Sequence, residues 1–336
     1  MGPIRHVLVV TLAAACTSTA RPAVPQPPSP APVPPVVAEP PEASSAPAQQ
    51  YAEAWPVAAF ADPGRRAKLE TAFAAIDRRI EEEMTAESIP GLAIGIVIDG
   101  QLAHARGYGV RDLTSKAPAR PDTVYRIGSI TKSFTGLAVL ALRDEGALAI
   151  DDPLVRWIPE AAGLVYPTRD APPMTLRQLM NHTSGLPRMG NYPPETGPSE
   201  ATILESLRSL ALDRAPGTAS VYSNLGFSLL GIAVAHAAGR PYHEVVETRI
   251  WKPLGMTSTY WDAAQVPAER RATTHEPSPA GPAPKAQDAR LGAGDGAGGI
   301  YSTVEDMARY VAFQLDAYPP RNDADDAPIR RASRRE

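Results

Sequence analysis

Residues 91–110 read GLAIGIVIDGQLAHARGYGV, and this stretch determines how the folded part of the chain begins. The apolar run 91–98 is typical of a buried strand and Asp99-Gly100 is a strong hairpin turn, so 101–110 is expected to return as its antiparallel partner. An amphipathic helix beginning near Pro63-Gly64 is predicted by apolar residues at helical spacing, namely Leu69, Phe73, Ile76, Ile80 and Met84. A helix followed by an antiparallel hairpin favours an α+β domain.

Helical patterns dominate the sequence after the hairpin. They are predicted for residues 130–145, 175–181, 201–212, 225–238 and 242–251. Gly146 ends the first of them, and Thr175–Gln178 and Ser302–Glu305 both have the form of a capping box. Residues 276–290 are expected to be a long loop. With no clean linker after residue 63, the sequence predicts one domain over residues 63–336.

Composition excludes several classes of function. The 336 residues carry 33 Lys+Arg against 37 Asp+Glu, a formal net charge of -4, so the chain lacks the positive excess that binds nucleic-acid phosphates. Its single cysteine excludes an intrachain disulfide framework and any multi-cysteine metal site. The six histidines have no metal-ligand spacing. We therefore expect neither a metal nor a cofactor.

The first sixty residues have the pattern of an export signal and a tether. Arg5-His6 precedes the apolar run 7–15 and then Cys16, which resembles the lipobox of bacterial lipoproteins, although Ala13 stands where leucine is preferred. Residues 1–16 are thus predicted to be a signal peptide whose Cys16 is acylated; the alternative is an ordinary secretory signal with an incidental cysteine. Residues 17–62 are expected to form a disordered tether, since 17–50 contain eleven of the 37 prolines. A bacterial protein of the cell envelope, lipid-anchored or periplasmic, is the prediction.

A candidate nucleophile lies at the start of the first helix after the hairpin. Ser129-Ile-Thr-Lys132 follows an extended stretch, and a serine at a helix start lies at the positive end of the helix dipole. Lys132 shares its helix face, and a partly desolvated lysine can accept the hydroxyl proton. The chain has five lysines, and only Lys132 has a serine three residues before it. The alternative is an N-cap serine beside a solvated lysine.

A second polar pair precedes a later helix. Tyr222-Ser-Asn224 places a phenol, which can pass protons between nucleophile and leaving group, two residues before an amide, which can hold a substrate carbonyl. On its own this motif is better explained as a turn with a capping serine or asparagine.

Together these motifs resemble the serine beta-lactamase-related family, which includes class C beta-lactamases, D-alanyl-D-alanine carboxypeptidases and related esterases. The resemblance runs from about residue 65 to the C-terminus. Besides the two motifs, it rests on ordered matches at YRIGSITKSF (125–134), MTLRQLMNHTSGLP (174–187), PLGM (253–256) and GGIYSTVEDM (298–307).

The resemblance implies a fold and a set of roles. The fold would be an antiparallel sheet flanked by helices plus a mostly helical subdomain. Ser129 would be the acylated nucleophile, whose backbone N–H supplies one oxyanion donor, and Lys132 its proton partner. Tyr222 would be the general acid/base and Asn224 the substrate-orienting residue. The implied function is a serine hydrolase acting through an acyl-enzyme on a small amide, ester or peptide: a beta-lactam, a D-Ala-ended peptide or a simple ester.

One family element has no match in the sequence. A third motif, Lys-Thr-Gly or His-x-Gly, is expected downstream of Asn224, yet no histidine or lysine there fits it. We therefore expect a domain that lacks its C-terminal strands and is poorly stable and poorly active by itself. The alternative function is a non-catalytic binding protein of the cell envelope that retains the scaffold.

Three other features are given structural interpretations. Gly294-Asp-Gly-Ala-Gly-Gly299 matches a dinucleotide fingerprint by letters, but no buried strand precedes it, so it is expected to be a flexible loop before a helix capped by Ser302. His182 is expected to cap the helix before it. Trp157 and Trp251 are expected to be packing residues.

Overall fold

The structure, a computed structural model, describes residues 9–11, 60, 62–193, 196–276, 278–279, 281–285 and 290–336. Cys16 and nearly all of the predicted signal and tether lie outside the described residues. Within the described residues, none of the helices is both long and apolar enough to cross a bilayer.

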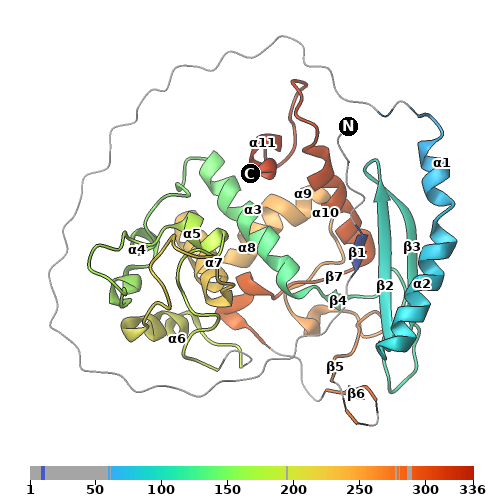
Figure 1. Ribbon diagram of the computed structural model, residues 1–336, viewed down its shortest axis with the longest axis horizontal. Helices are drawn as coiled ribbons and strands as arrows, with labels where there is room; N and C mark the ends of the chain where they lie inside the picture. Colours follow the sequence, from blue (N-terminus) through green and yellow to red (C-terminus); the bar gives the residue numbers. More distant parts are fainter. Residues whose placement is uncertain are drawn as a thin grey trace.

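The predicted hairpin forms the sheet at one side of the molecule (Figure 1). Strands β2 (Gly91–Ile98) and β3 (Gln101–Gly109) are antiparallel, with a bulge at Ile96/Val97. Asp99 and Gly100 both have positive φ, 51° and 75°, as a tight two-residue turn between twisted strands requires. Strand β1 (Val9–Thr11) pairs with the other edge of β2, opposite residues 94–96.

Helices cover both faces of the hairpin (Figure 1). The single helix expected from residue 63 is two helices, α1 (Arg65–Glu70) and α2 (Phe73–Ala86). The interruption coincides with Thr71, whose hydroxyl donates to the Lys68 carbonyl and competes with regular helical bonding. Ile76, Ile80 and Met84 of α2 pack on one face of the hairpin. Helix α10 (Val304–Asp316) packs on the other, through residues that include Ala308 and Val311.

Asp77 anchors α2 to β3. Its carboxylate accepts hydrogen bonds from the Tyr108 hydroxyl at 2.5 Å and from His104 and Arg106, each at 2.8 Å. Burial alone would raise the pKa of Asp77, but these three donors outweigh it and hold the pKa at about 2. The carboxylate is therefore ionised at neutral pH and fixes the helix against the sheet.

The rest of the domain is mostly helical and is organised around α3 (Thr131–Asp144). This helix matches the predicted range 130–145, and Gly146 follows its end at φ 75°. Ten of its residues are buried, and the seven apolar ones among them join the largest apolar core of the described residues. The surrounding α-helices are α4 (Leu154–Trp157), α5 (Leu176–Met180), α6 (Glu200–Glu205), α7 (Asn224–Ala238), α8 (Tyr242–Val246) and α9 (Lys252–Leu254).

Short helical turns and strands connect these helices. The 3-10 turns are η1 (Gly128–Ile130), η2 (Pro159–Gly163), η3 (Ser206–Ser209), η5 (Ala263–Gln265) and η6 (Gly292–Ala297). A π-helical turn, η4 (Glu247–Trp251), joins α8 to α9. Two further antiparallel pairs are β4 (Tyr125–Arg126) with β7 (Tyr301–Ser302), and β5 (His275–Glu276) with β6 (Ala283–Pro284). The predicted α+β class with a mostly helical subdomain is confirmed.

One of the two predicted helix caps is correct and the other is displaced. Thr175 caps α5 in a complete capping box with Gln178. Helix α10 begins one residue later than expected: its N-cap is Thr303, whose side chain accepts from the Asp306 N–H. Ser302 is instead the last residue of β7, and its buried hydroxyl pairs with that of Thr259. Strand pairing thus fixes Ser302 and moves the cap along the chain.

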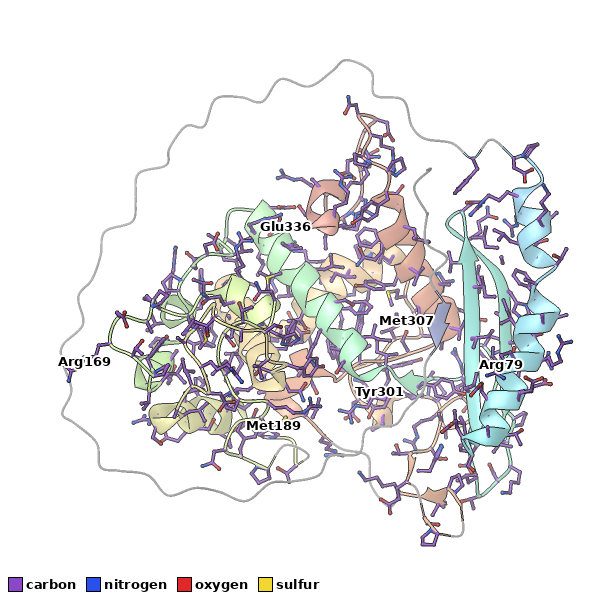
Figure 2. The ribbon with its side chains drawn as sticks, in the orientation of Figure 1. Arg79, Arg169, Met189, Tyr301, Met307 and Glu336 are labelled. Atoms are coloured by element: carbon purple, nitrogen blue, oxygen red, sulfur yellow. The ribbon has the colours of Figure 1, made fainter. Side chains whose placement is uncertain are left out.

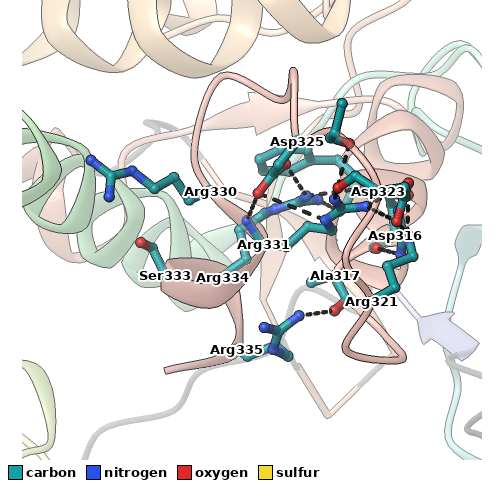
Figure 3. Close-up of polar contacts among 12 residues, drawn as sticks. Asp316, Ala317, Arg321, Asp323, Asp325, Arg330, Arg331, Ser333, Arg334 and Arg335 are labelled. Carbon is teal, nitrogen blue, oxygen red and sulfur yellow. Dashed lines mark hydrogen bonds and ion pairs between the residues drawn. The ribbon is translucent and has the colours of Figure 1, made fainter. Parts of the chain in front are cut away.

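Arginine–aspartate pairs hold the segment after α10 (Figure 3). Helix α11 (Arg331–Arg335) turns the Arg334 side chain inward, where it is fully buried and pairs with Asp316 of α10 at 3.0 Å. Arg331 pairs with Asp323 at the same distance. A buried guanidinium loses its hydration, so these carboxylates are needed to offset that cost. They fix the last described residues against α10.

Candidate active site

Ser129 lies where the β4 strand passes into helix α3. It occupies the middle of η1, the 3-10 turn immediately before α3, rather than the first turn of the helix itself. Gly128 precedes it with a φ of 52°, a conformation that a residue with a side chain adopts only under strain. The Ser129 side chain is exposed and so open to a substrate.

Lys132, one turn further on, is 7% exposed and its amine contacts Ser129 directly. Its Nζ lies 3.2 Å from Ser129 Oγ, 2.9 Å from Asn224 Oδ1 and 2.5 Å from the Ala297 carbonyl oxygen. The nitrogen also lies 4.8 Å from the centre of the Tyr222 ring. The amine is therefore held within reach of the serine by three oxygen atoms from three segments of the chain.

Tyr222 and Asn224 complete the group that the sequence predicted. The Tyr222 hydroxyl donates to Ser129 Oγ at 2.6 Å. Asn224 is the first residue of α7, and its amide nitrogen donates to the sulfur of Met189 at 3.3 Å. Met189 and Tyr301 both lie near the end of α3 that bears Ser129 (Figure 2). All four predicted residues thus meet, although up to 95 positions separate them in the sequence.

The Gly294–Gly299 stretch contributes to this site, which its interpretation as a flexible loop did not anticipate. Its first four residues belong to η6, whose Ala297 carbonyl accepts from Lys132 and whose Gly296 carbonyl accepts from Thr135 at 2.7 Å. A Cβ added at Gly296 would lie 2.7 Å from the Phe227 carbonyl oxygen on α7. Glycine is therefore needed for close packing, which the sequence does not reveal before α7 is placed.

His182 ends the preceding helix as expected, but through its backbone. It follows the C-cap of α5 in the left-handed conformation, with a φ of 62°, and its N–H donates to the Leu179 carbonyl at 3.3 Å, while the next N–H along the chain donates to the Gln178 carbonyl at 2.8 Å.

The side chain and carbonyl of His182 bond elsewhere. Its ring nitrogen Nδ1 accepts from the Ser223 N–H at 3.1 Å, and its carbonyl accepts from the Val221 N–H at 2.8 Å. The ring packs against that of Tyr222, with 4.5 Å between centres. Trp251 is buried and Trp157 packs against the core, as expected.

The hydrogen bonds around Lys132 allow a proton to move between nitrogen and serine. Asn224 Oδ1 and the Ala297 carbonyl can only accept, so they occupy two N–H groups in either charge state of the amine. The third position on the Lys132 nitrogen faces Ser129 Oγ. In the protonated amine this position carries an N–H that donates to the serine, and in the neutral amine it carries a lone pair that can take the serine proton. The other two hydrogen bonds stay in place in both states. Lys132 is thus placed to act as a base toward Ser129.

Comparisons with known proteins show the family to which the chain belongs. Residues 76–335 match the family model described as Beta-lactamase. The chain is 34% identical over 257 residues to the D-alanyl-D-alanine-carboxypeptidase/endopeptidase AmpH of Escherichia coli (strain K12), which covers 74% of this chain and 64% of that protein. The chain therefore spans less than two thirds of the length of this relative.

Two solved structures share the fold. The octameric penicillin-binding protein homologue from Pyrococcus abyssi superposes with a TM-score of 0.65 at 29% identity, over 78% of this chain and 59% of that one. The beta-lactamase/D-alanine carboxypeptidase from Yersinia pestis, complexed with citrate, gives a TM-score of 0.57 at 31% identity, over 69% of this chain and 65% of that one.

Proposed function

The chain belongs to the Beta-lactamase family, and from this premise we propose that it is a serine hydrolase that acylates Ser129 and then releases the acyl group to water. The contact of the Lys132 amine with Ser129 Oγ, at 3.2 Å, carries the proposal. A buried lysine beside an exposed serine at a helix start has the geometry of a base and its nucleophile.

Acylation uses one proton transfer from the serine and one to the leaving group. Ser129 Oγ attacks the substrate carbonyl carbon while its proton passes to Lys132, and Tyr222, hydrogen-bonded to the same oxygen, protonates the leaving amine or alkoxide. The Lys132 ammonium and the Tyr222 phenolate remain.

Deacylation reverses both transfers. The phenolate takes a proton from water, whose oxygen attacks the acyl carbon, and Ser129 Oγ leaves with the proton returned by Lys132. Both residues thereby regain their starting states. The net reaction is hydrolysis, and this chemistry requires no cofactor.

Reaction with a fluorophosphonate, which phosphonylates activated serines, tests the proposal. We expect covalent labelling of the chain at one serine, in competition with a fluorescent penicillin. A folded chain that stays unlabelled would instead favour the non-catalytic binding protein of the cell envelope.

We further propose that the substrate carries a carboxylate close to the scissile bond, as a D-Ala-ended peptide or a beta-lactam does. The Arg188 guanidinium lies 5.1 Å from the centre of the Tyr222 ring, and the hydroxyl of that ring contacts the nucleophile. Within the described residues Arg188 is exposed and forms no ion pair, so its charge is available to a substrate. The relatives named as carboxypeptidases support the peptide as the first choice.

A matched pair of substrates checks this choice. For a peptide ending in D-Ala-D-Ala, we expect kcat/KM to be about tenfold higher with a free C-terminal carboxylate than with a C-terminal amide, which corresponds to ~1.4 kcal/mol. Arg188→Gln should remove the difference by lowering kcat/KM for the peptide with the free C-terminal carboxylate. Equal rates for acid and amide in the wild-type chain would contradict the assignment and favour simple esters.

We also propose that Cys16, outside the described residues, carries a lipid that anchors the chain to a bacterial membrane. Expressed in a bacterium with an alkyne fatty acid, the wild-type chain should take up the label and sediment with membranes, whereas Cys16→Ser should do neither. An unlabelled wild-type chain in the periplasmic fraction would identify an ordinary secretory signal instead.

A further inference from the structure

His182 holds the segment that carries Tyr222 from two sides. Its carbonyl accepts from the Val221 N–H and its Nδ1 accepts from the Ser223 N–H, so the residue binds the backbone immediately before and after the tyrosine. The imidazole also packs against the Tyr222 ring. These three contacts hold the Tyr222 phenol beside Ser129.

The contacts fix which imidazole nitrogen carries the proton. Because Nδ1 accepts a backbone N–H, it must be unprotonated, and the ring proton of the neutral form lies on Nε2. A protonated imidazole would turn an N–H toward the Ser223 N–H. The hydrogen bond would then be replaced by two opposed donors.

We propose that His182 is a positioning residue: its neutral imidazole keeps the Tyr222 hydroxyl on Ser129, and its protonation releases the tyrosine and stops acylation. This inference rests on the serine hydrolase function proposed for the site. Beyond that function, it assigns to His182 a role exerted through Tyr222. It also makes the reaction depend on a further proton, the one that the imidazole binds.

The surroundings of the ring favour the neutral form. The charged and titratable groups that face it are Lys132 from α3, Tyr222, and Arg188 beyond the tyrosine ring; Phe227 of α7 packs against it as well. Burial lowers the pKa of His182 below its usual range, and Lys132 lowers it further whenever its amine is protonated. The imidazole therefore stays neutral, and Tyr222 in place, at neutral pH.

Asparagine is the informative replacement. Its side-chain oxygen can accept from the Ser223 N–H at any pH, and asparagine tolerates the positive φ of 62° at this position. Alanine offers no acceptor and is strained there. His236→Asn is the matched control, because His236 bonds the Trp157 carbonyl and Glu200 at the far end of α7.

The test measures the rate constant of fluorophosphonate labelling of the full chain between about pH 5 and pH 8. In the wild type and His236→Asn we expect the rate constant to fall more steeply toward acid pH than in His182→Asn, by the one proton that His182 binds. His182→Asn should keep labelling within a few fold at neutral pH and lack this additional proton dependence. His182→Ala should be slower by about 100-fold at every pH, since the phenol is misplaced. Identical acid limbs in wild type and His182→Asn would overturn the proposal.

A second measurement does not depend on activity. Nitrogen-15 NMR of the wild-type imidazoles should show one ring, absent in His182→Asn, with Nδ1 unprotonated and Nε2 protonated at neutral pH. A protonated Nδ1 in that ring would refute the inference. If the wild-type chain is never labelled, the hydrolase proposal fails, and the NMR result alone decides whether His182 binds the Tyr222 segment.

Discussion

Ser129→Ala is expected to abolish covalent labelling and to lower kcat/KM for any accepted substrate by at least about a thousandfold, the largest single loss at this site. The substitution removes the oxygen that both Lys132 and Tyr222 contact. Because Ser129 is exposed, the change should leave the free energy of unfolding nearly unaltered. Mass spectrometry of the labelled chain and steady-state hydrolysis measure the effect.

Ser133→Ala is its matched control. Ser133 lies one turn further along α3, and its hydroxyl also pairs with a phenol, that of Tyr310, at 2.8 Å. We expect Ser133→Ala to be labelled like the wild type. If Ser133→Ala lost its labelling and Ser129→Ala kept it, Ser133 and not Ser129 would be the nucleophile.

Lys132→Met should lower the rate of acylation by about 100- to 10,000-fold, the usual contribution of a positioned base. Methionine has a similar length but cannot take the proton of Ser129. It also leaves Asn224 Oδ1 and the Ala297 carbonyl without their donor, so a loss of about 1–3 kcal/mol of stability is expected as well. Single-turnover labelling and urea unfolding separate the two effects.

The exposed lysine Lys252 offers the control for Lys132. Lys252→Met removes the same charge far from the serine and should leave labelling and unfolding close to the wild type. Lys132→Arg should remain slow even though it keeps the charge, because a guanidinium does not act as a base near neutral pH. Full activity in Lys132→Arg would show that the positive charge, and not proton transfer, is what the site needs.

Elements set by short-range signals could be predicted from the sequence. The hairpin at 91–110, helix α3 and the Thr175 cap are all found, because turn residues, apolar spacing and capping side chains act within a few positions. Errors arose where tertiary contacts decide. The run predicted at 201–212 is helical only to Ser209, and α10 begins after Thr303 because Ser302 belongs to a strand.

The candidate site follows the same division. Ser129, Lys132, Tyr222 and Asn224 could be proposed because their side chains have chemistry that a motif records. Ala297 contributes only a backbone oxygen, so its residue type carries no signal. His182 was recognised as structural, but its partner is 41 positions away, and nothing local indicates which N–H group its ring accepts.

The three hydrogen bonds of the Lys132 amine also bear on how this protein folds. They reach across 3, 92 and 165 positions of the chain. Contacts of such different range cannot form together in an early, locally ordered state, because closing the longer loops costs entropy before any bond compensates it. Any folding intermediate that lacks the packing of η6 on α7 would hold Lys132 beside Ser129 without the Ala297 carbonyl that orients its amine. Reactivity at Ser129 should therefore appear only with the last step of folding and report its completion.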